Sequence, residues 1–335
     1  MVMTNLAREP MAETYDVVVV GGGAAGLSGA LMLGRSRRSV LVVDAGEPRN
    51  APAAGVHGFL TRDGTSPAAL LAAGRADVGR YGVELLDGRV ASAIALDDGT
   101  FTVRLDDGRE VSSRRLLVAT GLVDELPDVP GIRERWGRDV LHCPYCHGWE
   151  VRDQAIGVLA SGPFAVHQAL LFAQWTADLT LFLHTTARSG DEEVEQLAAR
   201  GITVVEGEVS ALEVVEDRLA GVRLDHGEVI ACEALTVTPR FVARSAVLAS
   251  LGLAAVPHPL GIEVGEHFQA DAMGLTAVPG VWVAGNVADL TAVVVGVADA
   301  GVRAGAAINA DLIAEDSRRA VVAHRERTAV VGSTR

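Results

Sequence analysis

The sequence predicts an α/β protein with two Rossmann-like, doubly wound domains, the second of them inserted in the first. Three observations support this prediction. A strand–glycine turn–helix–strand unit opens the chain, a similar rhythm begins near Ala155, and a later strand that ends in a tight turn at Gly285 returns the chain to the first unit. We therefore expect a discontinuous first domain, residues 1–121 and 243–335, around a second domain of residues 122–242.

The composition is that of an ordered globular protein. The 335 residues are 49% hydrophobic, and the net charge is −14, so the chain is long enough for two domains. The acidic balance argues against nucleic acid, whose phosphates attract a basic surface. No apolar run reaches the ~18 residues of a membrane span, and we identify no secretory signal. We expect a cytoplasmic protein that binds neither membrane nor nucleic acid. All 29 basic residues are arginine, which excludes a P-loop lysine and a lysine Schiff base.

The N-terminal unit is built from three segments. Residues 1–14 are expected to form a disordered lead. Asp16–Val20 is an apolar run of strand length, Ala24–Leu33 has helical composition, and Val40–Val43 is a second strand of the buried type that ends at Asp44. Because a helix joins the two strands, we expect them to lie parallel in a βαβ unit.

A hairpin region follows the first unit. Phe101–Leu105 alternates between apolar and polar side chains, the Asp-Asp-Gly sequence at 106–108 indicates a turn, and residues 109–111 return. Leu116–Ala119 is interpreted as a further buried strand, closed by a Thr-Gly pair.

The second unit has the same rhythm as the first. Ile156–Ala160 and Leu179–Leu183 have the composition of strands, and Phe164–Ala173 has that of the helix between them. Near the C-terminus, Val281–Asn286 is a strand that runs into a tight turn, and Gly301–Ile313 is an alanine-rich helix. These last two elements are expected to complete the first domain.

A dinucleotide fingerprint lies at the first turn from strand to helix. Gly21, Gly23 and Gly26 follow a run of valines and fit the pattern G-x-G-x-x-G. The first glycine allows the tight turn, the second lets the backbone approach a pyrophosphate, and the third lets the helix pack against the strand. Asp44 stands where an acidic side chain can bind ribose hydroxyls. The motif predicts a nucleotide cofactor without separating FAD from NAD, and an ordinary glycine turn is the alternative.

The most informative motif is a Cys-Pro-Tyr-Cys tetrad in which Cys143 and Cys146 are flanked by His142 and His147. Cysteines at this spacing can cycle between dithiol and disulfide. At the start of a helix both sulfurs lie on one side, where the helix N-terminus favours the thiolate. Pro144 suits the first helical turn because it donates no hydrogen bond there. His147 can take or deliver a proton near pH 7, so we predict a catalytic role for both cysteines and for His147.

Three other interpretations of the tetrad stay open. The two cysteines and the flanking histidines could bind zinc, although no second Cys/His pair follows at finger spacing, and we expect no metal. A glutaredoxin-type fold uses the same tetrad, but near the start of a small domain. The cysteines could also be purely structural.

The third cysteine, Cys232, lies in a strand-like run and is expected to be buried and inert, and His142 is expected to have a local packing role.

Taken in order, these motifs resemble the low-molecular-weight thioredoxin reductase family of flavoproteins, which has the two-domain fold of the pyridine nucleotide-disulfide oxidoreductases. The resemblance rests on Gly21–Gly26 with Asp44, the strand end Ala119–Gly121, the cysteine pair, and Pro279–Asn286. It implies FAD in the discontinuous domain, a redox disulfide in the inserted domain, and a homodimer. The residues expected to hold FAD are Gly21, Gly23, Ala24, Ala25, Gly26, Asp44, Ala45, Arg49, Asn50, Val90, Ala119, Thr120, Gly121, Gly285 and Asn286.

The second glycine motif of this family, which holds NADPH, is altered in this chain. Ala160 replaces its first glycine, and Pro163 and Phe164 crowd the turn where a pyrophosphate should rest. A Cβ at the first glycine position obstructs the tight turn and the close approach of the backbone.

The arginine pair that grips the 2′-phosphate of NADPH is also replaced. The chain has Thr185 and Thr186 at these positions, with only Arg188 nearby, so the charge-assisted contacts to that phosphate are lost. We therefore expect the inserted domain to be a degenerate NAD(P)H-type domain without NADPH. Drift within a motif that still works is the alternative.

A third departure lies beside the cysteines. Reductases of this family commonly carry aspartate after the second cysteine, where this chain has His147. The string His142–Gly148 resembles the FAD-dependent dithiol oxidases of gliotoxin and holomycin biosynthesis, which close a disulfide in a small natural product and pass the electrons through FAD to oxygen. This resemblance implies that Cys146 faces the flavin, that Cys143 exchanges with the substrate, and that His147 accepts the thiol proton.

The sequence thus predicts a FAD-dependent dithiol oxidase that uses a small-molecule dithiol and O2 and releases H2O2. The alternatives are an NAD(P)H-dependent thioredoxin-disulfide reductase, a ferredoxin-linked variant, and a flavoprotein that binds dithiols or senses redox state without turnover.

Two further departures from the family pattern affect the flavin site. Asn286 replaces the aspartate that is usual in reductases, and the glutamine expected shortly after it is absent from residues 291–295.

Overall fold

The computed structural model describes residues 12–162, 164–186, 190–243 and 245–333. Most of the predicted N-terminal lead lies outside these residues, as do Pro163 and Arg188 of the altered second nucleotide motif. Thr14, which the sequence analysis assigns to the lead, already belongs to the first strand because it pairs with Ser112.

Five parallel strands form the sheet of the first domain. They are β1 (Thr14–Val20), β2 (Val40–Asp44), β3 (Glu84–Asp87), β6 (Glu110–Val118) and β19 (Val281–Val283), in the order β3-β2-β1-β6-β19. The valines of β1 are buried, as is typical of a parallel strand covered on both faces. Helix α1 (Ala24–Arg35) joins β1 to β2, which confirms the predicted βαβ unit.

Strand β6 is one continuous element. The first half of β6 pairs antiparallel with β5 (Phe101–Leu105), which pairs with β4 (Val90–Ala95), and the second half pairs with β19. The expected division into a hairpin return and a separate strand at Leu116–Ala119 is therefore wrong. The reason is that β1 pairs with β6 from Ser112 to Val118 and so carries the strand through its polar middle.

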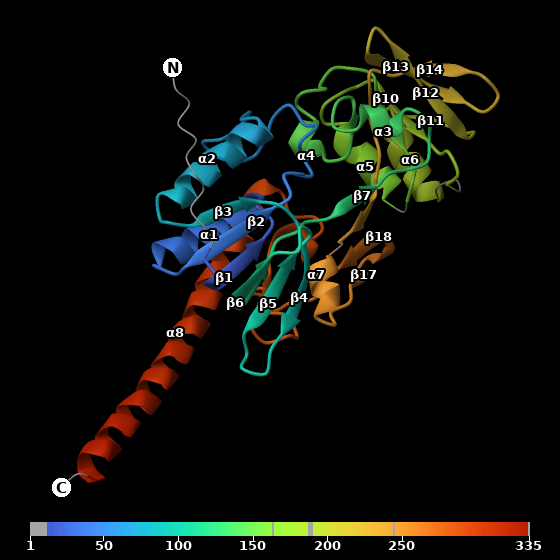
Figure 1. The fold of residues 1–335 in the computed structure, drawn as a ribbon. Helices are drawn as coiled ribbons and strands as arrows, with labels where there is room; N and C mark the ends of the chain where they lie inside the picture. The colour runs from blue at the N-terminus through green and yellow to red at the C-terminus, as the bar shows by residue number, and fades with distance from the viewer. Residues whose placement is uncertain (1–11, 163, 187–189, 244, 334–335) are drawn as a thin grey trace, which may run out of the picture.

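Helices and strands cover the two faces of this sheet. Helices α1, α2 (Pro67–Gly79) and α8 (Val294–Ser333) pack on one face, and β4, β5 and α7 (Ala246–Ser250) pack toward the other (Figure 1). Helices α1 and α8 meet backbone to backbone, since a Cβ at Gly301 would overlap the carbonyl of Ala25. The C-terminal helix is thus part of the first domain, as the sequence analysis expects.

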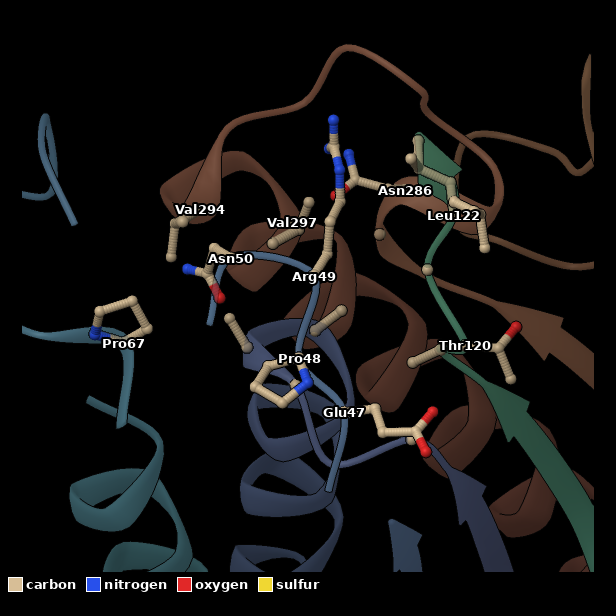
Figure 2. Close-up of a pocket in the computed structure, with 18 of the residues that line it drawn as sticks. Glu47, Pro48, Arg49, Asn50, Pro67, Thr120, Leu122, Asn286, Val294 and Val297 are labelled. Atoms are coloured by element: carbon tan, nitrogen blue, oxygen red, sulfur yellow. The ribbon is translucent and has the colours of Figure 1, made fainter. Parts of the chain in front are cut away.

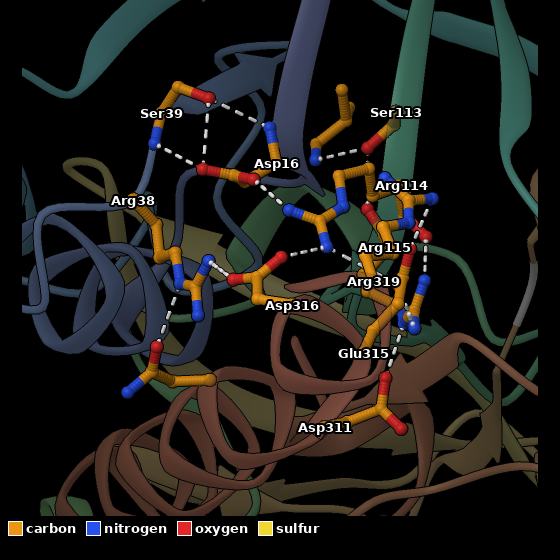
Figure 3. A network of polar contacts seen from close by, with 12 residues as sticks. Asp16, Arg38, Ser39, Ser113, Arg114, Arg115, Asp311, Glu315, Asp316 and Arg319 are labelled. Atoms are coloured by element: carbon orange, nitrogen blue, oxygen red, sulfur yellow. Dashed lines mark hydrogen bonds and ion pairs between the residues drawn. The ribbon is translucent and has the colours of Figure 1, made fainter. Parts of the chain in front are cut away.

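The middle of α8 is fastened to the sheet by a network of ion pairs (Figure 3). Arg114 of β6 contacts Asp16 of β1 at 2.8 Å and Asp316 of α8 at 2.5 Å. The neighbouring Arg115 contacts Glu315 at 2.7 Å. Because Arg114, Arg115 and Glu315 are largely withdrawn from water, the network fixes the direction in which α8 leaves the sheet.

Beyond this network, α8 projects from the body of the molecule (Figure 1). Between residues 317 and 329, every side chain except that of Ala323 is exposed. The predicted end of this helix at Ile313 is wrong, because the helix continues to Ser333 through a segment that contains several alanine, arginine and glutamate residues, which favour helix. None of the helices in the described ranges combines the length and apolar character that crossing a bilayer requires.

The second domain has its own parallel sheet. Strands β8 (Val140–Leu141), β9 (Ile156–Leu159), β10 (Leu179–Phe182), β11 (Thr203–Val205) and β15 (Ala234–Thr236) lie in the order β11-β10-β9-β15-β8. One face is covered by helices α5 (Ala165–Phe172) and α6 (Asp191–Ala199), and the other by the meander β12 (Val209–Val215), β13 (Arg218–Leu224) and β14 (Val229–Ala231). This second sheet confirms the predicted fold class. Two short helices, α3 (Ile132–Arg135) and α4 (Pro144–His147), flank β8 in the chain.

The chain crosses between the two domains on a pair of short strands. Strands β7 (Val123–Glu125) and β16 (Arg240–Val242) pair antiparallel, and β16 continues into a small sheet with β18 (Gly261–His267) and β17 (Val256–His258). The second domain is thus inserted in the first. We propose that the second domain spans residues 122–242. The two crossing strands, β7 and β16, lie at these boundaries and support the proposal.

Candidate functional site

A single cavity of about 660 Å³ extends from the glycine turn after β1 to the cysteine pair of α4. It lies between the two domains and is lined by residues of both. Figure 2 shows part of the lining near the first domain, including Arg49, Asn50 and Asn286. Of the eighteen residues predicted for the site, every one except Gly26 lines this cavity. Sequence reasoning did not identify several apolar lining residues, among them Pro48, Leu122, Val294 and Val297.

The glycine turn has the geometry that its motif predicts. Gly21 has a φ of +104°, and a Cβ there would lie 2.5 Å from the carbonyl oxygen of Ala119, which directly follows β6. A Cβ at Gly26 would overlap the carbonyl of Gly21, which explains why Gly26 supports the turn from behind instead of lining the cavity. By contrast, nothing lies within 4 Å of a Cβ at Gly23. The space beside Gly23, at the start of α1, can therefore accept a phosphate group.

Asp44 holds this turn together from the end of β2. One carboxylate oxygen accepts a hydrogen bond from the backbone N–H of Gly22 at 3.0 Å, and the other lies 3.3 Å from the guanidinium of Arg75. Arg75 comes from α2 and also pairs with Asp87 at 2.5 Å. The sequence gives no sign that Arg75 contacts Asp44, because Arg75 belongs to no motif.

The side chain of Arg49 is engaged at the crossing strands. Its Nε and Nη2 atoms donate to Asp124 of β7 at 2.8 and 2.7 Å, and its guanidinium stacks 5.2 Å from the ring centre of Phe241 on β16. Arg49 and the neighbouring Asn50 both line the cavity. The predicted cofactor contact of Arg49 therefore stays a prediction. In the structure its guanidinium joins the first domain to the crossing strands β7 and β16.

Asn286 shapes the far wall of the cavity. Its Nδ2 donates to the carbonyls of Asp289 and Ala292, both at 2.9 Å, and so holds the loop between the short helix η1 (Gly285–Val287) and α8. Val294 and Val297 follow on the first turns of α8 (Figure 2). This loop contains the segment from which the expected glutamine is absent.

The cysteine pair is a disulfide at the start of α4. Cys143 is the N-cap residue, Pro144 is the first helical residue, and the Cα atoms of Cys143 and Cys146 are 5.2 Å apart. The backbone N–H groups of Cys146 and His147 donate to the carbonyl of Cys143 at 3.2 and 3.1 Å. The helix start predicted at the cysteine pair agrees with this geometry, and both cysteines line the cavity.

An aromatic cluster supports helix α4, which we call the redox helix because it carries the disulfide, on the second domain. The rings of Tyr145 and Trp175 meet edge to face at 6.2 Å, and Trp175 packs in turn against Phe172 at 6.0 Å. Gly148 follows α4 directly, and a Cβ there would lie 2.5 Å from the carbonyl of Pro144 and 2.8 Å from the ring of Trp175. The position of the disulfide thus depends on close contact between Gly148 and Trp175.

The substitution Gly148→Ala is expected to displace α4 from Trp175. Overpacking of this kind costs about 1–3 kcal/mol, and the displaced disulfide should react more slowly with a dithiol. Urea unfolding and the rate of disulfide reduction measure the two effects. Gly162→Ala is the matched control in the same domain, because nothing lies within 4 Å of its Cβ. Equal behaviour of the two variants would contradict this account of the anchor.

The two flanking histidines differ in their surroundings. The Nδ1 of His142 lies 3.0 Å from the carbonyl oxygen of Val237, and its ring packs edge to face on Phe241 at 5.2 Å. This is the local packing role expected for His142. Burial lowers the pKa of His147, the nearby Glu150 opposes this by raising the pKa, and His57 lowers it further. His147 is therefore neutral near pH 7 and able to accept a proton.

Cys232 is separate from this site. Its side chain is buried and donates to the carbonyl of Ala234 at 2.7 Å, and burial raises the pKa of its thiol to about 12. Such a thiol is unreactive, as the sequence analysis expects. Among the described His, Cys, Asp and Glu side chains, no three are grouped as ligands for a metal ion.

Hydroxyl groups in and around the altered nucleotide motif of the second domain donate hydrogen bonds within the chain. Thr186 donates to the carbonyl of Ala160 at 3.1 Å, and Ser161 donates to the carbonyl of Thr238 at 3.0 Å. The hydroxyl of Thr238 donates in turn to Gln168 at 2.8 Å. The polar atoms around the first turn of this motif thus bond to one another.

Known proteins with similar sequences share this architecture. The sequence profile of the family described as pyridine nucleotide-disulphide oxidoreductase matches residues 15–325. The chain is 31% identical over 318 residues to the protein named thioredoxin reductase sirT from Leptosphaeria maculans, a match that covers 90% of this chain and 95% of that protein.

Solved structures agree with these sequence matches. The crystal structure of HlmI is 48% identical, with a TM-score of 0.86 over 93% of this chain and 97% of that one. The oxidoreductase from Agrobacterium tumefaciens is 37% identical, with a TM-score of 0.83 over 90% and 99%. The resemblance to thioredoxin reductase-like flavoproteins that the motifs indicate is therefore confirmed.

Proposed function

Because this chain belongs to the pyridine nucleotide-disulphide oxidoreductase family of FAD-binding enzymes, we propose that it is a dithiol oxidase. It takes two electrons from a small-molecule dithiol, closes that dithiol to a disulfide, and passes the electrons to O2, which leaves as H2O2. We further propose that it works in the cytoplasm as a homodimer, in line with the family resemblance and the composition.

The observation that carries the proposal is the shape of the site. One cavity connects the glycine turn at Gly23 with the disulfide of Cys143 and Cys146. At the second nucleotide motif, by contrast, Thr186 and Ser161 bond to neighbouring backbone carbonyls. A direct path from sulfur to the cofactor together with a degenerate nicotinamide site favours electron entry from a dithiol.

The residues of the first domain fit FAD. The space beside Gly23 at the start of α1 suits the pyrophosphate, and Asp44 suits the ribose of the adenosine. The side-chain oxygen of Asn286 can accept a hydrogen bond from a ribityl hydroxyl, as the aspartate of reductases does. When bound there, FAD would supply a two-electron carrier between the reduced cysteine pair and O2.

The cysteines and His147 perform the exchange. His147 accepts the proton of the first substrate thiol, and the resulting thiolate bonds to the sulfur of Cys143 while the bond from Cys143 to Cys146 breaks. Cys146 leaves as a thiolate. The second substrate thiol then attacks the substrate sulfur of the mixed disulfide and passes its proton to the departing sulfur of Cys143, which closes the product ring and releases Cys143. The substrate has lost two electrons, and the cysteine pair has gained them.

Anaerobic stopped-flow spectroscopy tests this function. A small dithiol such as dithiothreitol is expected to bleach the bound flavin rapidly, whereas NADPH and NADH at the same concentration leave it oxidised. Admission of oxygen should then restore the absorbance and produce one H2O2 per flavin. Rapid bleaching by a nicotinamide nucleotide, with none by dithiols, would overturn the proposal.

The name of the relative from Leptosphaeria maculans, thioredoxin reductase, favours a second candidate. This candidate is an NAD(P)H-dependent reductase of a protein disulfide. It predicts the opposite order of reactivity in the same experiment. Reduction by photoreduced ferredoxin alone would instead indicate a ferredoxin-linked enzyme, and the absence of steady peroxide production with a dithiol would indicate a sensor.

A further inference from the structure

A contact between the two domains lies directly beside the redox helix. His57 comes from the loop that follows β2, and Glu150 comes three residues after His147 in the second domain. The Nε2 atom of His57 lies 3.4 Å from a carboxylate oxygen of Glu150, and its Nδ1 atom lies 3.5 Å from Asp63. The imidazole of His57 therefore lies between two carboxylates, one from each domain.

The loop that carries His57 is held in place by its own hydrogen bonds. The backbone N–H of Val56 donates to Thr65 at 2.8 Å, and that of Gly64 donates back to Val56 at 2.9 Å. A carboxylate oxygen of Asp63 accepts from the N–H of Gly58 at 2.9 Å. The loop is closed at its base, so the ring of His57 has a fixed place at the rim of the cavity that it lines.

Two polar side chains act on His147 from different elements. Glu150 belongs to the segment after α4, and its backbone N–H donates to the carbonyl of His147 at 3.2 Å. His57 faces the site from the first domain, and Asp63 stands behind it. Glu150 raises the pKa of His147 and His57 lowers it, while burial is the largest influence and also lowers it.

We propose that Glu150 and His57 are positioning residues with opposite effects on His147: Glu150 stabilises the imidazolium that forms when His147 accepts the substrate proton, and His57 opposes this by holding that carboxylate toward the first domain. This inference rests on the proposed function, which gives His147 a proton to accept. It assigns control of proton transfer to His147 to two residues that lie outside the cysteine motif. It also makes the chemistry of α4 depend on how the second domain sits against the first.

The sign of each effect follows from charge. Glu150→Gln removes a negative charge, so the imidazolium of His147 is less stable and the pKa of His147 falls. His57→Gln removes the imidazole that contacts Glu150 at 3.4 Å and leaves this carboxylate free to act on His147, so the pKa of His147 rises. Because Glu150 is partly exposed, each shift should be about half a pH unit.

Nuclear magnetic resonance of the oxidised, flavin-loaded protein tests the proposal without substrate. The nine histidines are labelled with ¹³C at Cε1, and the His147 signal is identified by its loss in His147→Gln. Glu150→Gln should move the titration midpoint of His147 to lower pH, and His57→Gln should move it to higher pH. The matched controls Glu326→Gln and His324→Gln lie on the exposed part of α8 and should leave the midpoint unchanged.

The rate of disulfide reduction should follow the same shifts. Neutral His147 is the reactive form, so the rate rises with pH through the pKa of His147, and this rise moves to lower pH in Glu150→Gln and to higher pH in His57→Gln. Shifts of the same sign, or none, in the NMR titration overturn the proposal. If a dithiol fails to reduce the wild-type flavin, the proposed function fails, while the titration still decides whether the two residues act on His147.

Discussion

The Cys143→Ser variant is expected to lose at least about 10³-fold in the rate at which a dithiol reduces the bound flavin. A hydroxyl cannot form the mixed disulfide through which the substrate gives up its electrons, and the variant has no disulfide between residues 143 and 146 to be attacked. The measurement is anaerobic stopped-flow reduction at saturating dithiothreitol. The flavin itself should remain bound, since the first domain supplies the glycine turn that fits FAD.

Cys232→Ala is the matched control for this experiment. Cys232 is a buried thiol outside the cavity, hydrogen-bonded to Ala234, so its loss should lower the free energy of unfolding by about 1 kcal/mol and leave the reduction rate unchanged. A Cys143→Ser variant whose flavin is still reduced rapidly by dithiol would show that electrons bypass the disulfide. The exchange mechanism would then be wrong.

Two glycine substitutions in the cofactor turn should separate folding from cofactor binding. Gly26→Ala places a methyl group on the carbonyl of Gly21, and we expect a loss of about 3 kcal/mol or more in stability, with little folded protein recovered. Gly23→Ala has an ordinary backbone conformation, with φ −74°, and open space around its Cβ. This variant should fold normally and bind FAD about 100-fold more weakly, because the methyl group occupies the space of the pyrophosphate.

The midpoint of thermal unfolding and the FAD dissociation constant are the two measurements. Gly79→Ala, at the end of α2, provides the control because its Cβ would also meet nothing within 4 Å; it should change neither quantity. Wild-type FAD affinity in Gly23→Ala would mean that the pyrophosphate lies elsewhere, and the proposed cofactor site would then need to be moved.

Local sequence patterns predicted the parts of this molecule that depend on local physics. The valine run of β1, the glycine turn and the helix start at Cys143 all stand where their motifs indicate. The errors arise where distant segments decide the outcome. β1 keeps β6 continuous through its polar residues, and the sequence around Leu116 contains no signal of this pairing.

The residues that the sequence analysis missed are those without a motif. Arg75 reaches Asp44 from another helix, and His57 meets Glu150 across the domain boundary. Each of these pairs joins residues far apart in the chain. A single sequence considered without an alignment contains no signal for such a pairing. The apolar lining from Leu122 and Val297 is invisible for the same reason, since both look like ordinary core residues.

The projecting end of α8 offers a practical handle on the enzyme. Ala320 is exposed on this helix, beyond the ion pairs that hold Asp316. Since the sequence contains no lysine, Ala320→Lys would introduce its single side-chain amine. Amine-coupling chemistry at mild pH would then attach the protein to an electrode or a bead in one orientation, with the disulfide left open to dissolved thiols.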